Sequence, residues 1–86
     1  MPEICRFYGI VIKMYFGDHA PPHFHAEYSG FEAVITIHSG AVLGGRLPPR
    51  AKGLVAEWAE LRRDELLHAW ERAENLSPIS KIEPLP

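Results

Sequence analysis

Polar and apolar residues alternate through the middle of the chain in a pattern that predicts a β-hairpin. The alternation covers His23–Tyr28 and resumes over Phe31–His38, and a strand sends successive side chains to opposite faces of its sheet. Ser29-Gly30 between the two runs suits a two-residue turn. If Tyr28 pairs with Phe31, counting outward sets the remaining register: Glu27 opposite Glu32, His25 opposite Val34, and His23 opposite Thr36.

Two further stretches favour strands. Ile10–Phe16 consists mostly of β-branched and aromatic residues, and its alternate positions are predicted to face the core: Ile10, Ile12, Met14 and Phe16. Ala41–Leu43 lies between glycine-containing turns and predicts a short strand. Together these segments predict an antiparallel three- to four-stranded β-meander over about residues 4–46.

The second half of the chain predicts two helices over about residues 49–75, packed on the apolar face of the meander. Pro49 suits a first helical turn, and Gly53 inside the first helix suggests close packing on the sheet. The apolar stripe changes side near Arg62-Arg63-Asp64, so we expect a break there, with Asp64 as the N-cap of the second helix. Both tryptophans are then expected in the core.

The segment 76–86 carries three prolines and is expected to dock as an edge strand or to remain a tail. The predicted fold class is therefore α+β, with residues 1–86 forming a single domain, because 86 residues are too few for a second core.

Composition and charge narrow the function classes. The net charge of −2 does not support nucleic-acid binding, although it leaves it possible, and the acidic excess lies after Gly53. No apolar stretch approaches the length of a membrane span. The one cysteine, Cys5, rules out an internal disulfide and fits a reducing compartment, so a cytoplasmic location is expected.

Histidines concentrate in the segment Gly17–Tyr28, which holds His19, His23 and His25. On the predicted strand His23, His25 and Glu27 share one face, and the two histidine Cα atoms lie about 6.6 Å apart, so both rings can reach one ion. His23, His25 and Glu27 are therefore candidate ligands for zinc, iron or nickel. His38 is expected to end near the proline loop, which would let His19, His23, His25 and His38 converge as candidate catalytic residues.

A metal-free site is the alternative. Histidine serves as a general acid or base at neutral pH, and Asp18 or Glu27 would orient the ring. Asp18, Arg46 and Arg50 are candidate binding residues, and the two arginines would hold an anion. A third interpretation is that the histidines simply occupy the solvated face of a hairpin and hold no ligand.

The most specific motif of the chain is Asp-His-x-Pro-Pro-His-Phe-His, which begins at Asp18. With this motif and further segments spread over nearly its whole length, the chain resembles a family of short bacterial proteins catalogued as a domain of unknown function. The matching segments are Phe7–Tyr15, Asp18–Tyr28, Leu47-Pro48, Trp58-Ala59 and Lys81–Leu85. The resemblance implies that the histidine segment is the family signature and that a second small protein is often encoded nearby, as in toxin and antitoxin pairs. It assigns no catalytic role.

The leading functional hypothesis is a small cytosolic binding or regulatory module, one half of such a two-gene system, with the small protein encoded nearby as its partner. The alternative is a small histidine-based or metal-dependent hydrolase or nuclease with its site on His19–His25. A homo-oligomer also remains open, because short meanders expose edge strands that pair between subunits.

Overall fold

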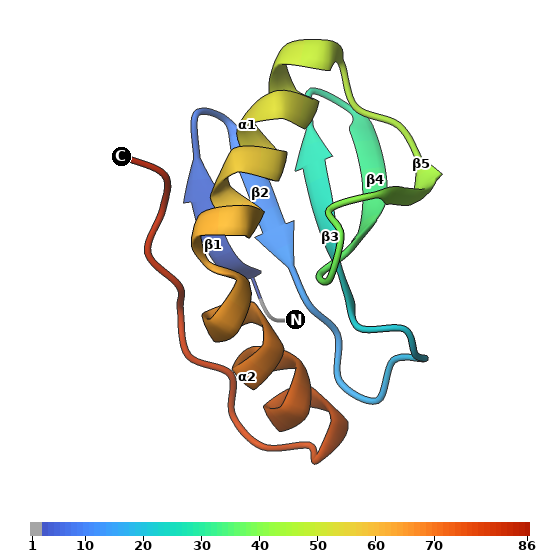
Figure 1. Cartoon of the computed structure of the whole chain (residues 1–86), viewed down its shortest axis with the longest axis vertical. Coiled ribbons are helices and arrows are strands. Elements are labelled where there is room, and N and C mark those ends of the chain that lie inside the picture. The colour runs from blue at the N-terminus through green and yellow to red at the C-terminus, as the bar shows by residue number, and fades with distance from the viewer. Residues whose placement is uncertain (1–2) are drawn as a thin grey trace.

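Five antiparallel strands followed by two helices give the α+β fold that the sequence predicts, with one strand more than the upper number expected (Figure 1). The computed structural model describes residues 3–86. The strands form one sheet in chain order: β1 (Glu3–Phe7), β2 (Ile10–Lys13), β3 (His23–Tyr28), β4 (Phe31–Thr36) and β5 (Val42–Gly45). The helices are α1 (Pro49–Leu61) and α2 (Arg63–Glu74).

The central β3–β4 hairpin has the predicted register. Tyr28 pairs with Phe31, and each further pair follows in step to His23 opposite Thr36. Ser29 and Gly30 form the turn, and both have positive φ, as a two-residue hairpin turn that matches strand twist requires. The alternation of the sequence therefore determines which side chains of β3 share a face.

The strands differ from the prediction at β1, β2, β4 and β5. β1 was not predicted, and it pairs with β2 across a turn at Tyr8-Gly9, where both residues have positive φ. β2 ends at Lys13, because the Gly17 backbone amide bonds to the carbonyl of Ala73 at the end of α2 and draws the chain away from the sheet. Phe16 consequently is 47% exposed and does not join the core.

β4 ends at Thr36, before His38. The Thr36 amide donates to the Ala41 carbonyl, and the Gly40 amide donates to the Thr36 carbonyl, so the chain turns back immediately after Thr36. This turn leaves His38 exposed. β5 begins one residue later than the predicted Ala41–Leu43 and continues through Gly44 and Gly45, which pair with Val34 and Ala33 of β4 instead of forming a turn.

The helix break lies where the change of apolar phase predicts it. The N-cap of α2 is Arg62, so the prediction of Asp64 as N-cap is wrong. Asp64 lies in the first turn of α2, where its negative charge interacts favourably with the helix dipole. Gly53 is exposed with open space around it, so it does not mark close packing on the sheet. Trp58 and Trp70 are both buried, as expected.

The C-terminal segment is neither a strand nor a free tail. It runs beside β1, where the Ile82 amide donates to the Ile4 carbonyl over 2.8 Å (Figure 1). The indole N–H of Trp58 donates to the Glu83 carbonyl, also over 2.8 Å, and Ile82 and Leu85 are buried. The segment thus closes the edge of the sheet that β1 would otherwise leave open.

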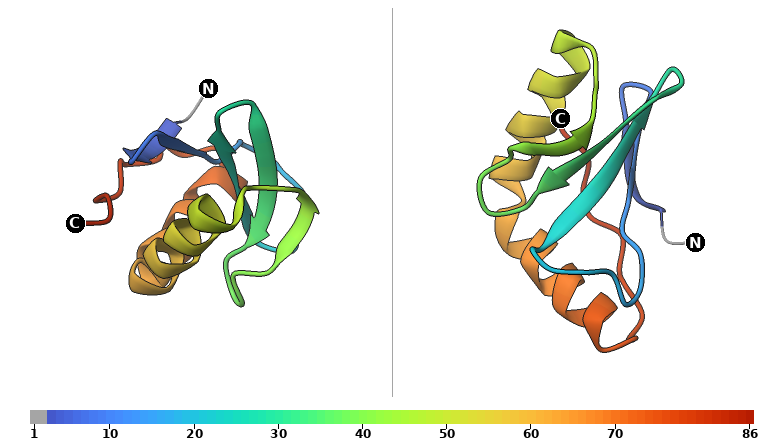
Figure 2. Two further views of the ribbon diagram at one scale, coloured as in Figure 1. Left: turned by 90° about the horizontal axis from the view of Figure 1, so that it is seen from above. Right: turned by 90° about the vertical axis from the view of Figure 1, so that its right-hand side faces the viewer.

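Both helices lie on the same side of the sheet (Figure 2). The core forms between the helices and the sheet. The opposite side, here called the outer face, carries side chains of the three central strands: Val11, Lys13, His25, Glu27, Glu32 and Val34. Within residues 3–86, no helix has both the length and the apolar character needed to cross a membrane.

Candidate functional site

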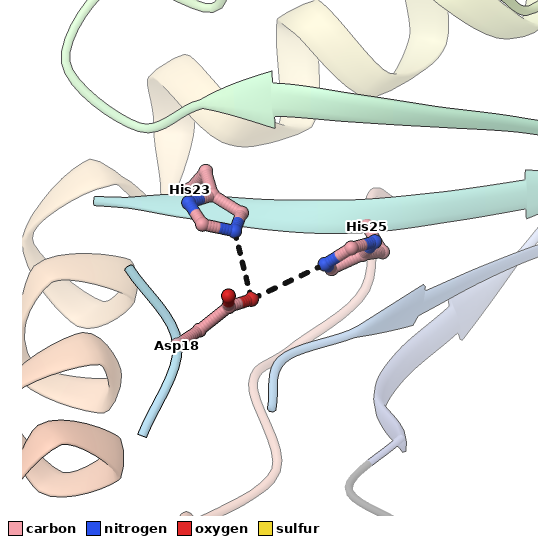
Figure 3. A group of neighbouring side chains, drawn as sticks. All are labelled: Asp18, His23 and His25. Carbon is pink, nitrogen blue, oxygen red and sulfur yellow. Dashed lines mark hydrogen bonds and ion pairs between the residues drawn. The ribbon is translucent and has the colours of Figure 1, made fainter. Parts of the chain in front are cut away.

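Asp18, His23 and His25 converge where the β2–β3 loop folds back over the start of β3 (Figure 3). His23 and His25 come from one face of β3, and Asp18 reaches them from the loop. Oδ2 of Asp18 lies 2.8 Å from Nε2 of His23 and 3.5 Å from Nε2 of His25. One ligand atom from each of the three residues lies within 4.8 Å of the other two.

The ring of His23 is held from two sides. Its Nδ1 lies 2.7 Å from the carbonyl oxygen of Pro21, and because a carbonyl only accepts hydrogen bonds, Nδ1 must carry the proton. The ring also packs against Trp70 of α2, with the ring centres 5.1 Å apart, and His23 is buried. Nε2 is therefore fixed in its aim at the Asp18 carboxylate.

The ring of His25 has a different environment. Tyr15 packs edge to face against it with the ring centres 4.7 Å apart. Its Nδ1 is inaccessible to water and has no hydrogen-bond partner among the described residues. The nearest carboxylate, that of Glu32 on β4, places Oε2 3.6 Å from this nitrogen. His25 consequently has a carboxylate beyond each ring nitrogen.

The charge of Asp18 is stabilised where it lies. Desolvation by burial acts to raise the pKa of Asp18, but the backbone amide of His19 and the ring of His23 outweigh it, so that the pKa lies below its ordinary value. The His19 amide donates to Oδ1 over 2.9 Å. Oδ1 is thus committed to the backbone, and Oδ2 is the oxygen turned toward the two rings.

The predicted set of site residues is only partly brought together. Glu27 shares the face of β3 with the two histidines, but its carboxylate pairs with Nζ of Lys13 over 2.9 Å, and Asp18 takes the place expected for it. His19 and His38 are exposed, and across residues 3–86 the metal-competent group contains neither of them. Four histidines therefore do not converge, because β4 turns away before His38.

The two candidate anion-binding arginines lie elsewhere. The guanidinium of Arg46 stacks over the ring of Phe31, 5.2 Å from its centre. Arg50 is exposed in the first turn of α1, where a cation gains nothing from the helix dipole. Neither belongs to the group formed by Asp18, His23 and His25.

The sequence model described as "Domain of unknown function (DUF4160)" matches residues 9–71. The chain belongs to the DUF4160 family. The match includes the whole of the β2–β3 loop and β3, and therefore all three residues of the candidate site. No curated protein and no solved structure matches the chain.

The sequence predicts both histidines and the loop as parts of the site, but it predicts a different role for Asp18. On the sequence alone, Asp18 binds or orients, and Glu27 completes the ligand set. The signal for Asp18 was its position five residues before His23, across a loop that Pro21 and Pro22 confine. The contacts of Trp70 and Glu32 with the rings left no such signal, because these residues come from α2 and β4 of the DUF4160 domain. Tyr15 lies in the same loop as Asp18, but it was expected in a strand that continued to Phe16.

Proposed function

We propose that this DUF4160 domain binds one divalent transition-metal ion through the carboxylate of Asp18 and Nε2 of His23 and His25. The observation that carries the proposal is the convergence of these three ligand atoms within 4.8 Å. Ligands about 2.0–2.2 Å from one ion lie about 3–4 Å from each other, so small side-chain movements complete the set. Two imidazoles and one carboxylate suit zinc, iron or nickel and leave coordination positions open.

The hydrogen-bond inventory supports a cation at this point. Because Nδ1 of His23 donates to the Pro21 carbonyl, Nε2 of the neutral ring carries a lone pair, and the carboxylate of Asp18 also only accepts. Two acceptors 2.8 Å apart need a positive partner between them. Either a proton or a metal ion satisfies both, and Nε2 of His25, 3.5 Å from the same carboxylate oxygen, offers a third ligand atom that favours the metal.

The same inventory disfavours histidine acting alone as a general base. Both ring nitrogens of His23 face protein oxygens, and Nδ1 of His25 is inaccessible to water. A base needs a nitrogen within hydrogen-bond reach of its substrate. Of the functions weighed for the chain, hydrolysis therefore draws support mainly in its metal-dependent form.

Elemental mass spectrometry of untagged protein, purified without chelator, tests the metal centre. We expect one equivalent of a transition metal in the parent protein and none in the double variant His23→Ala, His25→Ala. The matched controls are His19→Ala and His38→Ala, which remove exposed histidines outside the group. Metal-free parent protein that also fails to take up zinc, iron or nickel on dialysis would refute the proposal.

We further propose that the domain serves as a cytosolic binding or regulatory module for a small protein encoded nearby. Support comes from the outer face, which the helices leave uncovered (Figure 2). This face holds His25 beside charged residues of both signs. The single, buried cysteine fits a reducing compartment. Pull-down with and without chelator checks this role, and failure of the metal-loaded protein to retain any specific protein would count against it.

Metal-dependent hydrolysis is the second candidate, favoured by the open coordination positions of a three-ligand centre. The test is hydrolysis of an activated phosphodiester by zinc-, iron- and nickel-loaded protein. Turnover in the parent that disappears in His23→Ala, His25→Ala would favour an enzyme. Rates equal to those of the free ions would leave the binding module as the function.

A further inference from the structure

His25 lies between two carboxylates that come from different parts of the chain. Asp18 of the β2–β3 loop faces its Nε2, and Glu32 of β4 faces its Nδ1, at 3.5 and 3.6 Å. Nδ1 is fully shielded from water and has no hydrogen-bond partner among the described residues. A buried polar atom in this state costs free energy unless an acceptor completes it.

Metal binding specifies which atom carries the proton. If Nε2 of His25 binds an ion, the neutral ring must keep its proton on Nδ1, and that proton then needs an acceptor. Oε2 of Glu32 is less than about 1 Å beyond the usual hydrogen-bond distance. The side chain of Glu32 is 54% exposed and can move, while its backbone is held in β4.

We propose that Glu32 is the positioning residue of the metal centre: it accepts the Nδ1 hydrogen of His25, selects the tautomer with a free lone pair on Nε2, and aims the ring at the ion. This inference rests on the proposed metal site. His23 has the equivalent support from the carbonyl of Pro21. Each imidazole ligand thus has an oxygen acceptor behind it, the arrangement that protein metal sites use to orient their histidines.

The neighbouring glutamate shows why this task falls to Glu32. Glu27 lies directly opposite Glu32 in the β3–β4 register, and like charges in that position repel. Lys13 neutralises Glu27 through an ion pair of 2.9 Å. For Glu32, the ion pairs found within residues 3–86 are confined to His25, so its carboxylate is available to that ring.

Zinc affinity, measured by competition with a chromophoric chelator, tests the proposal in Glu32→Ala, Glu32→Gln and the control Glu27→Gln. We expect Glu32→Ala to weaken zinc binding about 10–100-fold, as loss of an outer-sphere partner does. Glu32→Gln should recover most of the affinity, because its amide oxygen still accepts the Nδ1 hydrogen. Glu27→Gln should bind zinc as the parent protein does.

A spectroscopic readout separates positioning from a general loss of negative charge. In ¹⁵N-labelled, zinc-loaded parent protein we expect a protected Nδ1–H signal from His25, and we expect Glu32→Ala to lose it. Parent-like affinity with a retained signal in Glu32→Ala would overturn the role of Glu32 alone, provided that His25→Ala still abolishes binding. Equal weakening in Glu27→Gln would also overturn it, and absence of zinc binding in the parent would refute the metal centre itself.

Discussion

Oδ2 of Asp18 lies 2.8 Å from Nε2 of His23, and this contact closes the loop between β2 and β3 onto the sheet. The backbone amide of Gly17 is anchored at the same time to the carbonyl of Ala73 at the end of α2. The site thus joins a loop, a strand and a helix. A cation placed there stabilises the folded chain because its ligands come together only in that state.

Asp18→Asn tests the charge of the loop ligand. Asparagine keeps the size and one neutral oxygen but loses the carboxylate, so we expect zinc affinity to fall by more than the roughly 10–100-fold that loss of an outer-sphere partner costs. Isothermal titration calorimetry measures the change. The control is Asp64→Asn, which removes an exposed carboxylate in the first turn of α2. Equal affinities in both variants would contradict a ligand role for Asp18.

Zinc is expected to raise the melting temperature of the domain by mass action. At a free concentration of 100 times Kd, a ligand that binds only the folded state adds about 2.7 kcal/mol, and each kcal/mol shifts the midpoint by about 4–8 °C in a domain of this size. Circular dichroism with and without zinc measures the shift. The His23→Ala, His25→Ala variant should show none, and an equal shift in that variant would place the ion elsewhere.

Substitution of glycine by alanine is expected to have opposite effects on stability at positions 53 and 45. Gly53 is exposed inside α1 with open space around it, so Gly53→Ala should raise the free energy of unfolding by about 0.5–1 kcal/mol. Gly45 has φ +70°, and an added Cβ would meet the carbonyl of Glu32. Gly45→Ala should therefore destabilise by more than the about 1–2 kcal/mol of the left-handed conformation alone. Urea denaturation measures both. A Gly45→Ala variant as stable as the parent protein would contradict the packing described for Gly45, and a destabilised Gly53→Ala variant would contradict the open space at Gly53.

Cys5 predicts a loss of stability at alkaline pH. Desolvation by burial raises the pKa of the Cys5 thiol above its ordinary value. As pH rises, the Cys5 thiol therefore loses its proton in the unfolded chain before it does so in the folded chain. The contribution of this thiol to the free energy of unfolding is fully present below its ordinary pKa and is lost as pH rises through the folded-state pKa. Urea denaturation at pH 7 and pH 10 should show a larger decrease for the parent than for Cys5→Ala. Identical decreases would show that the thiol does not contribute.

The docked C-terminal segment is expected to contribute to global stability. Ile82 is buried beside β1, and Ile82→Ala should lower the free energy of unfolding by about 2 kcal/mol, the lower end of the range for such truncations. Ile79→Ala, at a half-buried position of the same segment, is the control and should cost less. Thermal or urea unfolding measures both. Equal, small effects would mean that the segment is not docked in solution.

The predictable parts of the fold depend on neighbours in sequence. The register of β3 and β4 follows from the turn at Ser29-Gly30, and the helix break follows from the change of apolar phase near Arg62. β1 was not predicted, because it is only five residues long and its sequence carries little local signal for a strand. The turn at Tyr8-Gly9 that joins it to β2 was not predicted either. The docking of residues 76–86 depends on β1 and Trp58, which are distant along the chain.

The candidate site also combines a part that the local sequence predicts with a part that only the tertiary structure determines. The alternation along β3 by itself determined that His23 and His25 share a face, because a strand has a period of two residues. Only the tertiary structure decided that Asp18 and not Glu27 completes the group: Lys13 on the neighbouring strand pairs with Glu27, while the loop carries Asp18 back to the rings. Such choices depend on which charges other elements bring close, and no local pattern encodes them.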